Sequence, residues 1–227
     1  AIVLAVGIFI NGAIVQFAVF DASMTRALAI ILFILLVFIS ASYVVDVVHR
    51  KTFRAHFAHP IDGFAVGTWI AGASVCSTAL SQQLPAWKPF VQILVIGNIG
   101  LWIFFVYRTI LNFFQLFKTE LGQKVHGILL LSTVSTQSIV IAWGAAFGDS
   151  PGYRMVAPWM ISLGVVFYCL SFYLIIRRYI GEGTEIDLDK GWFNTNCIWH
   201  GAMSITGLAS AVSGVVPPDF TLLIWLW

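Results

Sequence analysis

The chain has 227 residues, of which 59% are hydrophobic and only 10% are charged, and its formal net charge is +2. The mean hydropathy is +0.92. This composition excludes a water-soluble domain and a nucleic-acid-binding surface, and it predicts an all-α integral membrane protein.

Apolar runs long enough to cross a bilayer recur along the whole chain. Seven are complete and an eighth is partial, at about residues 1–20, 25–48, 61–81, 89–107, 127–148, 156–177, 196–216 and 220–227. A spanning helix needs about 20 apolar residues, and the last run is shorter than that. We therefore expect a single transmembrane domain over residues 1–227 that is a fragment of a longer protein.

Basic residues indicate the topology, because Lys and Arg collect in short cytoplasmic loops. Those that follow the even-numbered segments are Arg50, Lys51, Arg54, Arg108, Lys118, Lys124, Arg177, Arg178 and Lys190. The opposite loops hold Arg26, Lys88 and Arg154. We expect Lys51, Lys118 and Glu185 to be cytoplasmic and Gln83 and Gly152 to be external. Residues 109–124, with several Phe and Leu beside Lys, predict a cytoplasmic helix lying in the membrane interface.

The odd-numbered segments are rich in small and polar residues, whereas the even-numbered ones are bulky and apolar. The third segment carries a stripe of Gly67, Ser74 and Ser77, and the seventh carries one of His200, Gly207 and Ser210. This alternation predicts helical hairpin repeats around a central pore, with the odd helices inside. The alternative for each stripe is close packing of helices through small residues, which requires no pore.

The fifth segment is apolar overall but has polar residues through its centre. These are Ser132, Thr133, Ser135, Thr136, Gln137 and Ser138. Hydroxyls and amides facing hydrocarbon cost free energy unless they are paired, so this helix is expected to be internal. The residues predicted to line the pore are Asn11, Gly67, Ser74, Ser77, Ser132, Thr133, Thr136, Gln137, Gly144, His200, Gly207 and Ser210. Alternatively, the polar groups of the fifth helix only hydrogen-bond neighbouring helices.

No catalytic, cofactor or metal-binding residues are predicted. The three cysteines have irregular spacing, and all five lysines fall in loops, which argues against a retinal Schiff base within the membrane. A membrane haem or redox protein using His126 and His200 is one alternative function, and a helical bundle that transports nothing is another.

Three stretches resemble a known family in the expected order. They are His59-Pro60 followed by Phe64, the run Leu131-Ser-Thr-Val-Ser-Thr-Gln-Ser138, and the stretch from Phe193 to Ala209 that contains Trp199-His-Gly-Ala-Met203. The chain is similar to the tellurite-resistance/dicarboxylate transporters, which are related to voltage-dependent anion channels and include the bacterial TehA proteins and the plant guard-cell slow anion channels. The resemblance implies ten helices in five hairpins around an anion pore, trimers, and a gating phenylalanine on a ninth helix, which is missing from this sequence.

Composition and resemblance together predict a channel or carrier for anions, either C4-dicarboxylates or small inorganic anions, and not an enzyme. Hydroxyls and the Gln137 amide would replace part of the hydration shell of an anion without a fixed cation that would trap it. The expected setting is the bacterial inner membrane.

Overall fold

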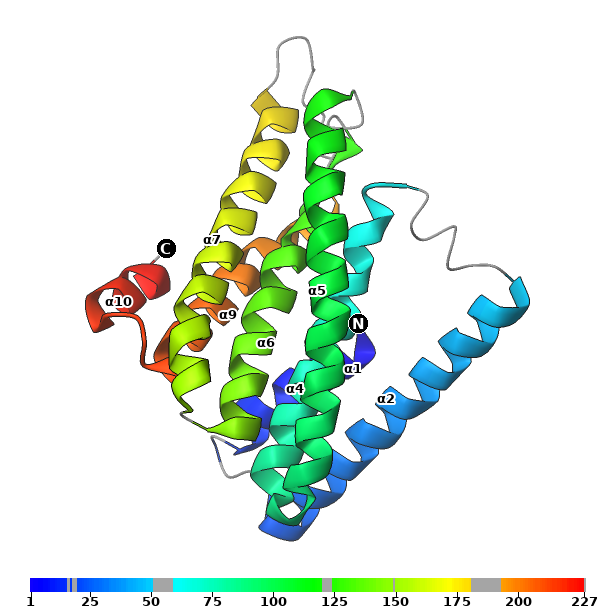
Figure 1. The fold of residues 1–227 in the computed structure, drawn as a ribbon, viewed down its shortest axis with the longest axis vertical. Helices are drawn as coiled ribbons and strands as arrows, with labels where there is room; N and C mark the ends of the chain where they lie inside the picture. The colour runs from blue at the N-terminus through cyan, green and yellow to red at the C-terminus, as the bar shows by residue number, and fades with distance from the viewer. Residues whose placement is uncertain are drawn as a thin grey trace.

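The computed structural model describes residues 1–15, 17, 20–50, 59–119, 124–148, 150–180 and 193–226. Every regular element in these ranges is a helix (Figure 1). In chain order the elements are α1 (Ile2–Phe9), η1 (Ile10–Ile14), α2 (Ala22–Arg50), η2 (Asp62–Val66), α4 (Gly67–Gln83), η3 (Pro85–Trp87), α5 (Lys88–Lys118), η5 (Gly127–Leu130), α6 (Leu131–Phe147), α7 (Pro151–Ile180), η6 (Asn194–Cys197), α9 (Ile198–Ser213) and α10 (Pro218–Leu226). Of the residues used above to assign sidedness, Lys51, Arg54, Glu185 and Lys190 lie outside the described ranges.

Five helical stretches in the described residues are long and apolar enough to cross a membrane. They are Ala22–Val48, Asp62–Gln83, Pro85–Lys118, Gly127–Phe147 and Pro151–Ile180. The prediction of an all-α integral membrane protein is therefore confirmed. The first and seventh segments form the shorter helices Ile2–Ile14 and Ile198–Ser213.

The helices divide into buried and peripheral ones according to their polarity. We compare the share of buried residues in the most apolar 18-residue window of each membrane-spanning stretch. This share is 78% in the stretch that contains α4 and 72% in the stretch that contains α6. The corresponding shares are 17% for α2, 22% for α5 and 44% for α7. The helix α6 contacts α4, α5, α7 and α9, and α4 lies between α1 and α6. The third and fifth segments, which are polar and odd-numbered, thus form the interior, which is where their side chains can be paired.

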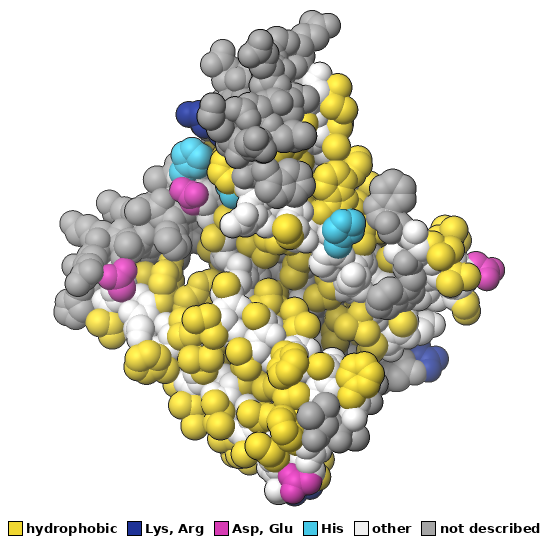
Figure 2. Space-filling model, turned by 180° about the vertical axis from the view of Figure 1, so that it is seen from behind, with side chains coloured by type: hydrophobic (Ala, Val, Ile, Leu, Met, Phe, Trp, Pro, Cys, Tyr) yellow, Lys and Arg dark blue, Asp and Glu magenta, His cyan; other side chains and the backbone are white. Residues whose placement is uncertain are grey.

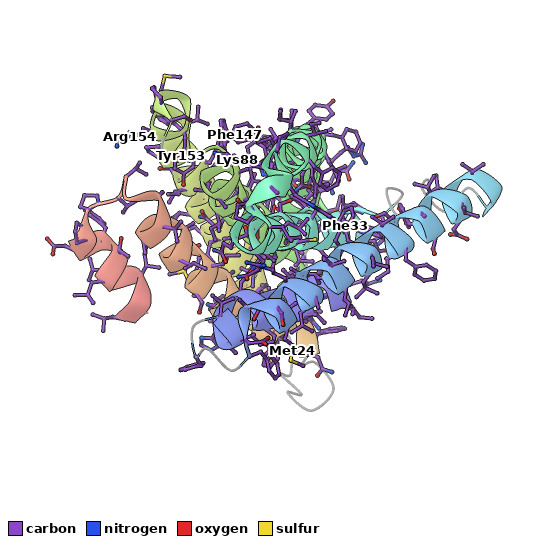
Figure 3. The ribbon with its side chains drawn as sticks, turned by 90° about the horizontal axis from the view of Figure 1, so that it is seen from below. Met24, Phe33, Lys88, Phe147, Tyr153 and Arg154 are labelled. Carbon is purple, nitrogen blue, oxygen red and sulfur yellow. The ribbon has the colours of Figure 1, made fainter. Side chains whose placement is uncertain are left out.

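The helix α2 leans away from the bundle toward its C-terminal end (Figures 1 and 3). Its side chains Ile31, Ile34 and Phe38 are exposed, and a further face of the molecule is covered mainly by hydrophobic side chains, with charged ones toward its edges (Figure 2). Surfaces of this kind are solvated by lipid tails rather than by water.

A glycine allows a close contact between the two most buried helices. A Cβ atom on Gly67 of α4 would lie 2.7 Å from the main-chain oxygen of Leu131 in α6. Only glycine allows the two backbones to approach this closely, as small residues do in membrane helix pairs.

The helix α5 differs from the prediction. It runs without a break to Lys118, and no separate interfacial helix is present in the described part of residues 109–124. Asn112 and Phe113 explain the continuation, because both are buried. The Phe113 ring contacts the rings of Phe64 and Phe167 at centroid distances of 5.1 and 5.9 Å. These contacts pack this part of α5 against η2 and α7 within the bundle.

Candidate functional site

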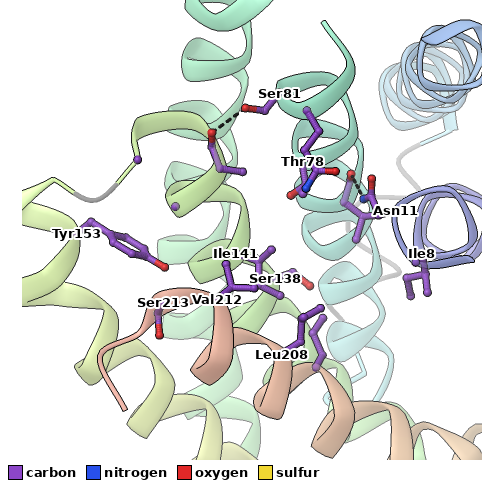
Figure 4. Close-up of a pocket in the computed structure, with 17 residues that line it drawn as sticks. Ile8, Asn11, Thr78, Ser81, Ser138, Ile141, Tyr153, Leu208, Val212 and Ser213 are labelled. Atoms are coloured by element: carbon purple, nitrogen blue, oxygen red, sulfur yellow. Dashed lines mark hydrogen bonds between the residues drawn. The ribbon is translucent and has the colours of Figure 1, made fainter. Parts of the chain in front are cut away.

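A cavity of about 930 Å³ lies among the inner helices α1, η1, α4, α6 and α9 (Figure 4). Its lining consists of Ile8, Asn11, Gly12, Val75, Thr78, Ser81, Gln82, Ser138, Ile141, Gly144, Ala145, Gly148, Tyr153, Ile205, Leu208, Val212 and Ser213. None of these residues carries a formal charge. The cavity is therefore a neutral space that mixes hydroxyl and amide groups with apolar side chains.

The cavity lies toward one end of the bundle. Its lining includes Ser81 and Gln82 near the end of α4, Gly148 just after α6, and Tyr153 in the first turn of α7. This is the end at which α4 and α6 finish and α5 and α7 begin, at the bottom of Figure 1. The sequence predicts this end to be external.

Most polar groups of the lining are already bonded to main-chain carbonyls. The Ser81 hydroxyl donates to Ala145 O at 2.7 Å, the Ser138 hydroxyl to Val134 O at 2.7 Å, and the Asn11 amide to Val75 O at 3.0 Å. The first and third of these bonds connect neighbouring helices and are drawn in Figure 4. They fix the wall of the cavity.

Two of the sequence-predicted pore residues, Asn11 and Gly144, line the cavity. Asn11 lies in η1, a short π-helical turn at the end of the first segment. Turns of this type widen the helix locally and are frequent at functional sites. The other predicted residues do not line this cavity.

Apart from Ser138, the polar residues of the fifth helix are fully buried and directed elsewhere. The hydroxyl of Thr133 donates to Gly164 O of α7 at 3.1 Å, and the amide of Gln137 donates to Ile161 O of α7 at 3.2 Å. Thr136 donates to Ser132 O at 2.8 Å and accepts from the indole nitrogen of Trp102 in α5 at 3.1 Å. Ser132 donates to Leu129 O at 2.6 Å. The structure thus places these residues against α5, α7 and their own helix.

The remaining predicted residues belong to helix contacts or to the surface. Gly67 packs against Leu131, as described above, and Ser77 donates to Ala73 O at 2.8 Å. Ser74 accepts from the Asn98 amide at 2.9 Å. In α9, Gly207 and Ser210 are buried, whereas His200 is exposed.

Several lining residues were not predicted from the sequence. Ser138, Ile141, Ala145 and Gly148 recur at helical spacings of three and four, so this row could have been recognised as a second face of α6. Tyr153 lies on an even-numbered, peripheral helix, and no sequence pattern distinguishes it.

His126 lies at the opposite end of the fifth segment, just before η5, and links that segment to the start of the seventh. Its Nδ1 atom lies 2.8 Å from the Thr195 hydroxyl and accepts from the Ile128 N–H at 3.5 Å. Its ring stacks on Phe193 at a centroid distance of 4.7 Å. The haem alternative requires this imidazole to face His200, which is exposed on α9.

Two further interactions complete this junction. The Gly127 N–H donates to Asn196 Oδ1 at 2.8 Å, and Arg178 of α7 donates to Val125 O at 2.7 Å. Burial lowers the pKa of His126, and the positive charge of Arg178 lowers it further, while Asp62 acts in the opposite direction. The neutral imidazole is therefore the favoured form in the folded protein.

Comparison with known proteins gives one match. The voltage-dependent anion channel family matches residues 1–224. Searches of curated proteins and of solved structures found no significant match. Because the family match covers nearly the whole chain, the protein belongs to the voltage-dependent anion channel family, and its general function is the transport of anions across a membrane.

Proposed function

We propose that the cavity among α1, η1, α4, α6 and α9 is part of the pathway for the anion, and that the transported anions are small and inorganic. The observation that carries this proposal is the neutral lining of a space of about 930 Å³ that lies between these helices toward one end of the bundle. A cavity of this size accommodates a partly hydrated ion together with several water molecules.

The lining can stabilise an anion weakly enough for the anion to dissociate and be conducted. The amide of Asn11 uses one N–H on Val75, and an amide nitrogen has a second, while Gln82 contributes another amide at the edge. Neutral donors replace part of a hydration shell. Among the described lining residues there is no fixed cation that would bind the ion tightly enough to stop conduction.

The same lining argues against C4-dicarboxylates as the main substrate. Proteins usually recognise a carboxylate through a charged donor, most effectively through the two parallel hydrogen bonds of an arginine. A dicarboxylate would need this at both ends, and the described residues of the cavity lining include no Arg, Lys or His.

Positive charge lies outside the cavity, at the same end of the bundle. Lys88 and Arg154 are exposed there, beside the first turns of α5 and α7 (Figure 3). Exposed cations near a pore raise the local concentration of anions without binding them in the pore.

Sidedness and assembly are further parts of the proposal. The charge bias supports an external position of the cavity end, the proposed setting is a bacterial inner membrane, and the family resemblance supports a homotrimer. Single cysteines at Gln83 and Gly152 should react with an external impermeant reagent and one at Lys118 should not, in a cysteine-free background. The reverse labelling pattern would invert the topology, and a monomeric mass in native mass spectrometry would contradict the trimer.

The substitution Gly12→Phe tests the pathway directly. Gly12 lines the cavity, and a Cβ atom there would meet no atom within 4 Å, so a large side chain can enter the space without displacing the wall. Chloride flux into liposomes that contain Gly12→Phe should fall about tenfold or more, because the ring occupies volume needed by the hydrated ion.

Gly97→Phe is the matched control. Gly97 is also a glycine with no atom within 4 Å of a built Cβ, but it is exposed on α5 and does not line the cavity. This variant should keep the flux of the unmodified protein. Equal flux through both variants, with equal amounts of folded protein, would refute the cavity as the pathway.

A further inference from the structure

The Phe and Lys residues that follow residue 109 belong to the last turns of α5 rather than to a helix lying in the membrane interface. The helix α5 has 31 residues and α7 has 30. At about 1.5 Å per residue each helix is about 45 Å long, whereas the hydrocarbon core of a bilayer is about 30 Å thick. The two helices finish at the same end of the bundle (Figure 1), so their last turns reach the layer of lipid headgroups.

An aromatic pair joins these last turns. The rings of Phe117 in α5 and Tyr173 in α7 stack with their centroids 5.9 Å apart and an interplanar angle of 25°. One turn earlier on α5, Phe113 stacks on Phe167 at the same distance. The inner pair is buried, whereas Phe117 is 38% exposed and Tyr173 is 54% exposed. The outer pair is therefore a fixed aromatic surface that faces the surroundings of the protein near the headgroup layer.

Two exposed cations lie beside this pair, one from each helix. Lys118 directly follows Phe117, and Arg177 lies one turn beyond Tyr173 on the same face of α7. The neighbouring Arg178 has a different role, because it donates to Val125 O at 2.7 Å and its guanidinium carbon lies 4.9 Å from the centre of the Phe193 ring. Arg178 thus connects parts of the protein, while Arg177 remains at the surface.

This arrangement is complementary to an anionic phospholipid in charge and in polarity. Basic side chains near a membrane surface attract lipids with a net negative charge, and a zwitterionic lipid offers them no net charge. The aromatic rings suit the glycerol and the first methylene groups, as they do in the aromatic belts of membrane proteins. Farther from the cations, Ile110 and Val166 are exposed and provide an apolar surface for the acyl chains.

We propose that the last turns of α5 and α7 bind an anionic phospholipid, with Lys118 and Arg177 contacting its phosphate and the rings of Phe117 and Tyr173 packing against its glycerol. This site is separate from the cavity and does not depend on its function.

The other end of α5 offers a comparison, because an exposed lysine lies beside aromatic rings there too. Lys88 follows Trp87, and the rings of Trp87 and Phe90 contact Phe33 of α2 at centroid distances of 6.3 and 5.3 Å. No charged residue lies within one turn of Phe33 in the sequence, so α2 adds no second cation to this cluster. A single cation beside the rings should bind an anionic lipid much more weakly than two.

The test measures how many lipids of each kind stay bound to the purified protein. The protein is mixed in detergent with equal amounts of phosphatidylglycerol and phosphatidylcholine that have identical acyl chains, and the bound lipids are counted by native mass spectrometry. One basic residue near an anionic surface corresponds to about a fivefold effect on binding. The double variant Lys118→Gln/Arg177→Gln should therefore lower the ratio of bound phosphatidylglycerol to phosphatidylcholine about tenfold or more.

Lys88→Gln is the matched control, since it removes an exposed lysine at the opposite end of the same helix, and its lipid ratio should stay close to that of the unmodified protein. The double variant Lys118→Arg/Arg177→Lys keeps both charges and should keep the preference for phosphatidylglycerol. An unchanged ratio in Lys118→Gln/Arg177→Gln, or an equal decrease in Lys88→Gln, would overturn the site.

A competition experiment distinguishes a lipid from a free anion with the same chemistry. Inorganic phosphate at the concentration of the lipid should not displace phosphatidylglycerol from the unmodified protein, because it has no apolar part to pack against Phe117 and Tyr173. Displacement by inorganic phosphate would show that the two cations bind a soluble anion, and it would overturn the proposal of a lipid site.

Discussion

In the N-terminal half of α6, Thr133 and Gln137 donate to carbonyls of α7, whereas in the C-terminal half Ile141, Ala145 and Gly148 face the cavity. The half with the greater number of polar side chains is the closely packed one. The half that borders the open space has small and apolar residues. Ser138, which lines the space just before this half begins, donates its proton to its own helix. In this helix polarity marks contact with protein, and small side chains mark the cavity.

The substitution with the largest expected effect is Gly67→Ala, in the closely packed region. The new methyl group would lie 2.7 Å from the Leu131 oxygen, which belongs to a backbone that cannot move cheaply. The free energy of unfolding should fall by about 2 kcal/mol or more, measured by thermal unfolding in detergent. Gly97→Ala, in open space, should be neutral or stabilising. Equal melting temperatures for the two variants would mean that α4 and α6 are not held together at this glycine.

A smaller effect is expected from Thr133→Val and Gln137→Leu, which remove bonds from α6 to α7. Each should lower the free energy of unfolding by about 1 kcal/mol. Flux per folded molecule should not change, because neither residue lines the cavity. Flux and melting temperature are to be measured on the same samples. A several-fold loss of flux at unchanged stability would instead show that these residues line the path of the ion.

The smallest effect is expected from pH, through His126 at the N-terminal end of the fifth segment. Because the pKa of His126 is lowered in the folded state, the unfolded protein binds a proton more readily. The stabilisation from the neutral imidazole is complete above about pH 6.5, the ordinary value for histidine, and is lost as the pH falls through the lower folded value. The melting temperature should therefore decrease between pH 7.5 and pH 5.

His126→Gln is the control for this pH dependence, because it removes the titrating group while keeping a polar side chain at the junction. Its melting temperature should decrease less over the same interval. An identical decrease in both proteins would assign the effect to other groups.

The fold class and the buried position of the third and fifth helices could be predicted from the sequence, because buried polar side chains need partners and lipid-facing surfaces need none. The length of α5 could not be predicted from the sequence. Polar Arg108 and Asn112 interrupt the apolar run, and only the structure shows that Asn112 is buried next to η2.

The side of α6 that borders the cavity could not be predicted, for a related reason. Its six polar residues surround most of the helix, so the sequence does not distinguish a cavity from a packed neighbour. The position of Tyr153 could not be predicted either, because it depends on the turn at Gly148 and on the space beside Gly144, which lies on a different helix.

The hydroxyl bonds within α6 also bear on how the chain enters the bilayer during synthesis. Ser132, Ser135, Thr136 and Ser138 donate to carbonyls three or four residues earlier in the same stretch. These bonds form as soon as the helix forms, before any neighbour has arrived. When this segment enters the bilayer, four of its hydroxyl groups already donate hydrogen bonds within the segment. Thr133 and Gln137 form their hydrogen bonds only when α7 packs against it. Insertion of this polar helix into lipid and its later packing against α7 can therefore be separate steps. The second step provides hydrogen-bond acceptors for Thr133 and Gln137.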